Sequence, residues 1–214
     1  MRSYVIKRIH GFSGVRLSGE LEPGHLPPPF DALPRAAIDC YPWDDCGYCP
    51  PAFAVAGWDE QGIRLLLAAD EPAIRAEVDR VGGPVCQDSC LEFFLRPSPG
   101  SAAYLNVEAT PRAVLHVGVG EGRHGRQVLT SLPDGFSPSH SVHRGRWWAV
   151  MYTVPAGFLR DRFGVALKSG LRMAGNFYKC GDLTAQPHWG MWQPYDLPQA
   201  DFHRPELFGA IALG

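Results

Sequence analysis

The stretch CQDSCLEFFLRP, residues 86–97, alternates apolar and other side chains at a period of two. Leu91, Phe93 and Leu95 share one face of the β-strand that this alternation predicts, and that face should point into a core. The opposite face then carries Cys86, Asp88, Cys90 and Glu92. A carboxylate in the middle of a sheet does not serve apolar packing. The second face is therefore either a solvated, ion-paired surface or part of a binding site.

Other segments predict more strands of similar length. Residues 53–70 predict a hairpin that turns at 59–62, and residues 71–81 predict one short helix. Pro155 suits the first position of a second short helix, over 156–164. Further strands are expected at 103–110, 113–120, 141–155, 171–182 and 208–213. Short strands at regular spacing favour an all-β fold, an antiparallel β-sandwich of the immunoglobulin or jelly-roll type with short helices and long loops.

The domain organisation follows from length and from the first forty residues. A chain of 214 residues suits one large domain. The first forty residues include PGHLPPPF, which predicts an extended arm (1–40) packed on the sandwich body (41–214). The 24 glycines and 20 prolines are spread along the chain, which indicates many turns and irregular loops rather than a linker.

Charge and hydropathy exclude two classes of partner. The net charge is only −2 and no basic cluster stands out, so no nucleic acid partner is expected. No stretch approaches the ~20 apolar residues of a membrane helix, so no membrane partner is expected either. The start, MRSYVIKRIHGFSG, has too short an apolar run for a signal peptide, which predicts a cytoplasmic protein with reduced cysteines.

The six cysteines form no strong metal pattern. Cys46 and Cys49 form a CxxC pair, but no second pair at zinc-binding spacing accompanies it. Cys86 and Cys90 are spaced CxxxC, and Cys180 is alone. We therefore expect small, partly buried thiols, with no metal and no cofactor. A structural metal or a redox pair at the CxxC is the less favoured alternative.

Polar residues on the other predicted strands can share a face with Glu92. Asn106 and Glu108 lie on one face of their strand, whereas Asn176 and Lys179 lie on opposite faces of theirs. If these strands are neighbours, one sheet face carries Glu92, Asn106, Glu108 and either Asn176 or Lys179. Such a set of donors and acceptors suits the hydroxyl groups of a sugar. The alternative is that these are ordinary polar groups of a solvated sheet face.

The segment 175–209 is rich in rings, amides and charged groups and poor in aliphatic residues. Rings beside the polar face would let the C–H face of a sugar stack while its hydroxyls meet amides and carboxylates. The candidate rings are Trp189, Trp192, Phe202 and His203. The alternative is that these side chains only pack the segment over the edge of the sandwich.

Two other functions use the same residues differently. Glu92 and Glu108 on adjacent strands would lie about 5 Å apart, a separation found in glycan-acting hydrolases. The sequence contains no HExxH motif, phosphate-binding glycine loop or nucleophile elbow. A third alternative is a structural or interaction protein whose pocket has closed. The pocket distinguishes the three functions. Sugar binding predicts an open pocket ringed by aromatics, hydrolysis predicts converging carboxylates, and a structural protein predicts a pocket filled by side chains.

Five motifs in order resemble those of the family nine carbohydrate-binding module-like proteins, β-sandwiches related to the sugar-binding modules of xylanases. The resemblance runs from about residue 40 to the C-terminus. The motifs are PVCQDSCLEFFLRP, YLNVEAT, GNFYKCGD, PHWGMWQP and DFHRPELFG. The resemblance implies non-catalytic binding of a mono- or oligosaccharide through a polar and aromatic sheet face.

The resemblance also assigns roles to residues. Glu92 and Asn176 stand where the family has the carboxylate and the asparagine that bind sugar hydroxyls. Cys86 and Phe202 stand where the family has two tryptophans that sandwich the terminal sugar. Stacking is then expected from Phe202 and one of Trp189, Trp192 or His203. Structural calcium occurs in the xylanase modules, which keeps calcium open although the sequence shows no clear calcium loop.

Overall fold

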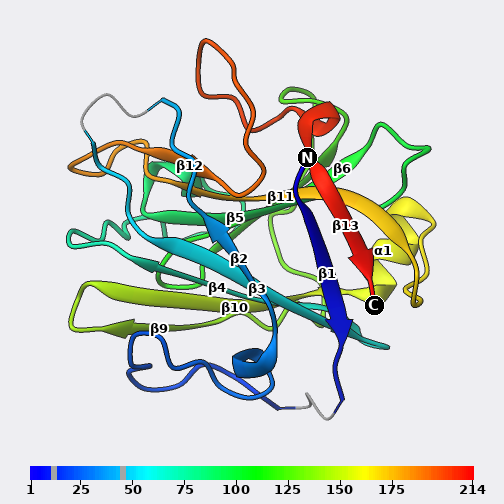
Figure 1. Ribbon diagram of the computed structural model, residues 1–214, viewed down its shortest axis with the longest axis horizontal. Helices are drawn as coiled ribbons and strands as arrows, with labels where there is room; N and C mark the ends of the chain where they lie inside the picture. Colours follow the sequence, from blue (N-terminus) through cyan, green and yellow to red (C-terminus); the bar gives the residue numbers. More distant parts are fainter. Residues whose placement is uncertain (11–13, 44–46) are drawn as a thin grey trace.

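A computed structural model describes residues 1–10, 14–43 and 47–214 (Figure 1). Cys46 of the CxxC pair lies outside the described residues. The described strands form one continuous curled sheet with two limbs. One limb contains β8 (Gln127–Val128), β7 (Leu115–Gly120), β6 (Tyr104–Ala109), β5 (Cys90–Arg96), β11 (Arg172–Cys180), β12 (Trp189–Met191) and β13 (Gly209–Leu213). The other contains β2 (Arg35–Ile38), β3 (Ala52–Asp59), β4 (Gly62–Asp70), β10 (Trp147–Pro155) and β9 (Ser139–His143).

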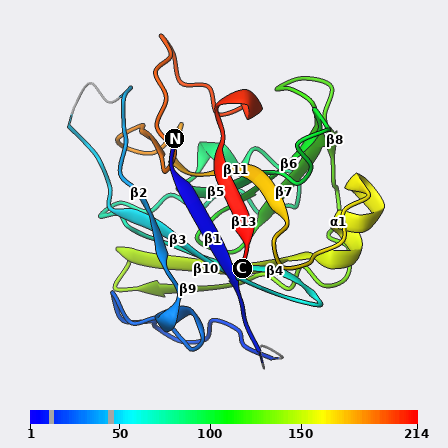
Figure 2. The ribbon, with the colours of Figure 1, turned by 45° about the vertical axis from the view of Figure 1, so that its right-hand side comes forward.

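The first strand, β1 (Ser3–Arg8), joins the two limbs by pairing with β13 on one side and β3 on the other. Figures 1 and 2 show β1 and β13 side by side. The first forty residues thus supply a central strand and also β2, which pairs with β3. The core lies between the limbs, where Phe93 and Phe177 of one limb share an apolar cluster with Leu65 and Leu67 of the other.

The chain is mostly β, as its sequence predicts, but the sheet is mixed rather than antiparallel. Both pairings of β1 are parallel, and the other pairings of the described strands are antiparallel. Antiparallel neighbours can be linked by a short turn, whereas parallel neighbours need a long connection. Because β1 and β13 come from opposite ends of the chain, no short turn dictates their direction. The immunoglobulin or jelly-roll connectivity stays a prediction.

Most of the predicted elements form, and one does not. The hairpin of 53–70 is β3 and β4, and the helix after Pro155 is α1 (Ala156–Phe163). The segment 141–155 is not one strand, because it turns between β9 and β10. No helix of the described residues is both long and apolar enough to span a membrane.

The helix predicted over 71–81 is wrong, because that segment is irregular. The Asp88 carboxylate accepts hydrogen bonds from the backbone N–H groups of Glu77 and Val78, at 2.8 and 2.7 Å. These donors are the groups that a helix would satisfy internally. Hydrogen bonds to the Asp88 side chain therefore take the place of the hydrogen bonds that a helix would form within 71–81.

The strand in the stretch 86–97 begins later than predicted, at Cys90. It is preceded by a short 3-10 helix, η2 (Val85–Gln87), so Cys86 is not a strand residue. The face prediction for the strand itself is confirmed, since Leu91, Phe93 and Leu95 all lie in the core between the limbs. Asp88 is buried by its backbone contacts and takes no part in the opposite face.

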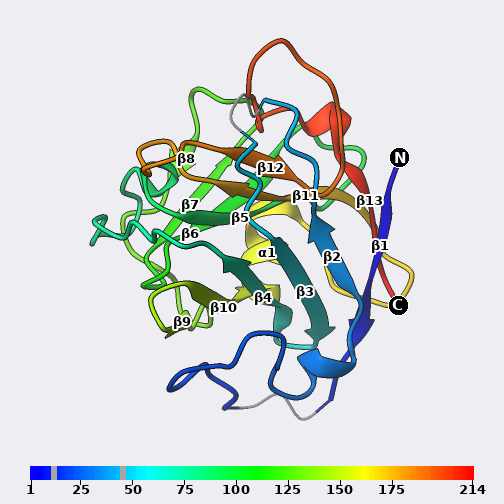
Figure 3. The same ribbon diagram turned by 60° about the vertical axis from the view of Figure 1, so that its left-hand side comes forward.

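Two further apolar clusters cover the outer faces of the limbs. Leu17, Leu26 and Phe30 pack on the outer face of β4 and β10, and their segment lies at the bottom of Figure 3. The adjacent Trp147 and Trp148 point to opposite sides, as predicted: Trp147 belongs to this outer cluster and Trp148 to the central core. A third cluster lies on the outer face of β5, β6 and β11, beneath the candidate site.

Candidate functional site

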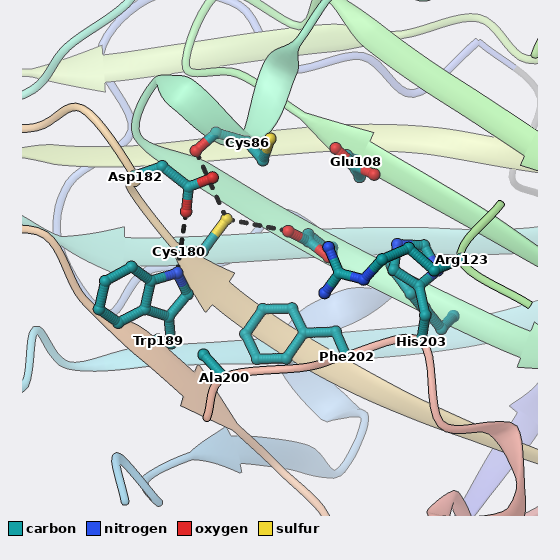
Figure 4. A pocket seen from close by; sticks show the side chains of 11 residues that line it. Cys86, Glu108, Arg123, Cys180, Asp182, Trp189, Ala200, Phe202 and His203 are labelled. Carbon is teal, nitrogen blue, oxygen red and sulfur yellow. Dashed lines mark hydrogen bonds between the residues drawn. The ribbon is translucent and has the colours of Figure 1, made fainter. Parts of the chain in front are cut away.

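A pocket of about 240 Å³ opens on the outer face of β5, β6 and β11, which is turned away from the core (Figure 4). It is lined by Cys86, Glu92, Phe94, Glu108, Arg123, Cys180, Asp182, Trp189, Ala200, Phe202 and His203. Carboxyl groups, ring faces, thiols, a guanidinium group and an imidazole thus meet in one cavity. These are the kinds of group that line sites for small polar ligands.

The strand register brings two glutamates together at the floor of the pocket. β5 and β6 are antiparallel, and Glu92 is directly opposite Glu108. On the other side of β5, Tyr178 of β11 is opposite Glu92. Residues that pair directly across strands point to the same side of the sheet. The two glutamates therefore share the pocket side.

Glu92 is almost completely buried, with 2% of its surface exposed. Its Oε1 accepts a hydrogen bond from the Cys180 thiol at 2.9 Å and lies 3.8 Å from the Cys90 sulfur. Burial raises the pKa of Glu92 well above its ordinary value, and the neighbouring Glu108 raises it further. The side chain is held in place by thiols rather than by a cation among the described residues.

Glu108 is oriented by a chain of hydrogen bonds. The Asn106 amide donates to Glu108 Oε1 at 2.7 Å, and Arg126 donates to Asn106 Oδ1 at 3.1 Å from Nε and 2.5 Å from Nη2. The Arg126 guanidinium also stacks over the Tyr104 ring, 4.2 Å from its centre. Burial raises the pKa of Glu108, while His116 and the Asn106 hydrogen bond oppose that rise. Asn106 thus acts on Glu108 and lines an adjoining hollow rather than the pocket itself.

Two rings form one wall of the pocket. Trp189 donates its Nε1–H to Asp182 Oδ1 at 2.8 Å, which fixes the indole. Phe202 stacks on Tyr178 with ring centres 4.0 Å apart and an angle of 11° between the planes. In Figure 4 both rings lie on one side of the pocket, opposite Cys86 and Glu108. An apolar surface therefore faces a polar one across the cavity.

His203 is a neutral hydrogen-bonding group at the end of the pocket. Burial, together with the nearby arginines, lowers its pKa to about 4. Its Nδ1 lies 2.7 Å from the Tyr104 hydroxyl, whose pKa burial raises to about 12. Arg123, paired with Asp201 at 2.9 Å, lines the same end.

Asn176 lies on the outer face of β11 but does not line the pocket. Its Oδ1 accepts from the backbone N–H groups of Phe177 and Gln193, at 2.9 and 2.7 Å, and its amide donates to the Gln193 carbonyl at 3.0 Å. The fully buried side chain therefore ties β11 to the chain after β12. A ligand would find these hydrogen bonds already used.

Lys179 and Trp192 lie on the core side of the sheet, away from the pocket. Lys179 is opposite Leu91, and its ammonium pairs with Glu71 at 3.1 Å and lies 2.6 Å from His188 Nε2. Trp192 packs edge-on against Phe177. Of the nine residues proposed from sequence, the pocket is lined by Glu92, Glu108, Trp189, Phe202 and His203.

Sequence reasoning missed Arg123, Cys180 and Asp182, which also line the pocket. Cys180 and Asp182 continue the alternation of Tyr178 within the predicted strand 171–182, so following that alternation to its end would have found them. Arg123 lies in a glycine-rich loop between β7 and β8, and nothing in its local pattern points to this site.

The buried carboxyl of Glu92 predicts a pH-dependent stability. Because its pKa is raised in the folded state, its contribution is full below the ordinary value near 4.5 and is lost as pH rises towards the folded value. The groups that face it, Glu108, Asp182, Cys90 and Cys180, carry no positive charge. Glu92→Gln has no carboxyl that titrates. Its free energy of unfolding, compared with that of the wild type, should therefore rise by about 1.4 kcal/mol for each pH unit between 4.5 and the folded pKa of Glu92.

Urea unfolding of both proteins between about pH 5 and pH 8, with metal chelated, measures this difference. The exposed Glu121→Gln is the matched control and should track the wild type. A gap between Glu92→Gln and wild type that stays constant with pH would contradict the expectation.

The comparison with known families shows to which family this chain belongs. The model of carbohydrate-binding family 9 matches residues 29–213. The chain belongs to carbohydrate-binding family 9. The resemblance carried by the five sequence motifs is thereby confirmed. No curated protein sequence matches this family 9 chain significantly.

Solved structures agree with the family 9 assignment. A candidate carbohydrate-binding protein from Bacteroides uniformis is 25% identical, with a TM-score of 0.73 over 86% of this chain and 88% of its own. A family 9 module from Caldicellulosiruptor kristjanssonii, in complex with glucose, has a TM-score of 0.68 at 12% identity, over 100% of this chain and 96% of its own. Its complex with cellotriose has a TM-score of 0.67 at 12% identity, over 99% and 93%. At 12% identity the likeness is one of fold.

Proposed function

We propose that the protein binds the end of a carbohydrate, without cleaving it, in the pocket on the outer face of β5, β6 and β11. The observation that carries this proposal is an open cavity where two buried carboxyl groups face a wall made by Trp189 and Phe202. A sugar ring has an apolar C–H face and hydroxyl groups around its edge, so it matches both surfaces at once.

The pocket suits a small ligand. Its volume of about 240 Å³ is below the ~300–1,000 Å³ of sites for drug-sized molecules. A pocket of this volume suits one or two sugar units better than a long chain lying across the surface. The glucose and cellotriose complexes of the C. kristjanssonii module support the same class, a mono- or oligosaccharide.

Each polar side chain has a defined role in this proposal. Glu92 and Glu108 hydrogen-bond neighbouring hydroxyls from the floor, and a carboxyl that keeps its proton can donate as well as accept. His203 contributes an imidazole nitrogen. Trp189 and Phe202 stack on the sugar face. Asn106 and Asn176 act indirectly, by holding Glu108 and the chain after β12.

Glycoside hydrolysis is supported less well by the same geometry. Glu92 and Glu108 are directly opposite each other, so their spacing alone would permit it. A two-carboxyl mechanism needs one group with a raised pKa and one that stays ionised. Burial raises the pKa of both glutamates here. The filled pocket expected of a purely structural protein is not present either, because the cavity is open.

A glycan array followed by calorimetry on the chelator-treated protein tests the proposed function. We expect a dissociation constant of ~10–100 µM for a mono- or oligosaccharide, because a shallow site buries little area. Aryl glycosides should not be turned over. Absence of binding to every sugar would overturn the proposal, and turnover that depends on Glu92 and Glu108 would replace it with hydrolysis.

Trp189→Ala tests the stacking wall. The half-buried indole is fixed at the pocket by Asp182, so its removal should leave the fold intact and weaken sugar binding by about 1–2 kcal/mol, or 5–30-fold. Phe53→Ala removes a half-buried ring elsewhere on the surface and serves as the control. Equal affinities of the wild type and both variants would exclude Trp189 from the ligand contact.

A further inference from the structure

Two thiols and a carboxyl group converge beneath the pocket. Cys90 and Cys180 are directly opposite each other on β5 and β11, and Glu92 is two residues from Cys90, on the same face. One ligand atom from each lies within 4.8 Å of the others, and all three side chains are buried. The three residues come from two adjacent strands of the sheet, which makes their spacing rigid.

The spacing is close to that of a tetrahedral zinc site. With Zn–S near 2.3 Å and Zn–O near 2.0–2.2 Å, neighbouring ligand atoms lie roughly 3.5–3.8 Å apart. The Glu92 oxygen is 2.9 Å from the Cys180 sulfur and 3.8 Å from the Cys90 sulfur. Shifts of about 1 Å or less in the side chains would therefore place the three atoms around one ion.

No cation pairs directly with the three side chains in the described part of the chain, since the nearby Lys179 pairs with Glu71 on the core side. Glu92, Glu108 and Asp182 line one pocket. The hydrogen-bond donors that the described residues offer to the Glu92 carboxyl are the two thiols. A bound divalent cation would neutralise this group of acids.

We propose that Cys90, Cys180 and Glu92 bind one zinc ion, with its fourth position open to the pocket. The two thiol protons, and the proton that the Glu92 carboxyl carries, pass to the solvent when the three side chains become ligands. Three protein ligands and one open position describe zinc sites that hold an exchangeable water. Sulfur ligands select zinc or a softer ion over calcium, which takes oxygen ligands.

The pocket provides the route to this site. Glu92 and Cys180 line the cavity, whereas Cys90 lies below them and is fully buried. An ion entering through the pocket would meet the carboxylate and one thiol first. Glu92 takes part in both proposals, but metal binding is measured with no sugar present, so this inference is tested separately from carbohydrate binding.

Metal binding to the purified, reduced and chelator-treated protein tests the proposal. Equilibrium dialysis against Zn²⁺ should give one ion per chain. Bound Co²⁺, used as a probe, should show a thiolate-to-cobalt charge-transfer band. Added Ca²⁺ should not displace the Co²⁺, so the band should remain. Cys90→Ser and Cys180→Ser should lose this band. Cys86→Ser, another thiol of the same pocket, and Cys40→Ser are the matched controls and should keep it.

Further outcomes decide against the site. Zinc bound equally by the wild type and the Cys90→Ser/Cys180→Ser double variant would overturn it. Binding lost in Cys49→Ser instead would move the metal to the CxxC pair. If the serine variants fail to fold, X-ray absorption of the wild-type zinc complex still decides. Two sulfur ligands near ~2.3 Å with two oxygen or nitrogen ligands support the site, and any other sulfur count contradicts it.

Discussion

Replacing Lys179 by methionine is expected to lower the free energy of unfolding by about 3–5 kcal/mol. Lys179 is fully buried and its ammonium pairs with Glu71 at 3.1 Å. Methionine fills similar space but leaves the equally buried Glu71 carboxylate without its cation. Removing one partner of a buried ion pair costs much more than removing the whole pair. Trp148 Nε1 donates to Glu71 at 3.2 Å, and His188 Nε2 lies 4.0 Å from the same carboxylate.

Chemical denaturation measures the loss in free energy of unfolding, and two further variants serve as controls for its cause. Adding Glu71→Gln to Lys179→Met should recover most of the stability, because the uncompensated charge is then absent. The exposed Lys168→Met should change stability by less than about 0.5 kcal/mol. Unchanged stability of Lys179→Met combined with weaker sugar binding would contradict the structure and return Lys179 to the ligand face.

Replacing Glu92 by alanine is expected to weaken sugar binding more than any other single change in the pocket. Glu92 occupies the middle of the polar floor, and removing one partner of a buried hydrogen bond costs about 1–3 kcal/mol. Affinity should therefore fall by about 10–100-fold. Calorimetry against the best sugar from the array, with metal chelated, measures the change.

Unfolding of the variant is a second way in which binding could be lost. The carboxyl of Glu92 has a raised pKa in the folded state, so it costs stability at neutral pH and Glu92→Ala is expected to stay folded. Urea unfolding of Glu92→Ala beside the wild type separates the two causes. Glu121→Ala, on the exposed loop after β7, should bind as the wild type does. Equal affinity of Glu92→Ala and wild type would place the ligand away from this floor.

Part of the candidate site could be predicted because it depends on one strand at a time. The alternation of 91–95 separates core residues from Glu92, and the same rule applied to 104–109 puts Asn106 and Glu108 on one face. Along β11, alternation correctly grouped Phe177 with Lys179 and Asn176 with Tyr178. It could not tell which pair faces the pocket, because that choice depends on how β11 registers against β5.

The loops were less predictable, for a different physical reason. Trp189 and Trp192 are three residues apart and chemically alike, yet one lines the pocket and the other packs in the core. Arg123 reaches the cavity from a glycine-rich loop and pairs there with Asp201, 78 residues away in the chain. No local pattern encodes contacts of that separation.

The amino-acid sequence by itself determined the β class, the apolar face of each main strand and the motifs of a carbohydrate-binding family. These follow from backbone geometry and side-chain type over a few neighbouring residues. Only the tertiary structure decided that β1 runs parallel between β13 and β3, that Lys179 pairs with Glu71 in the core, and that two thiols meet Glu92 beneath the pocket. Those features depend on pairing between distant segments, where burial and register select among arrangements that local geometry leaves equally open.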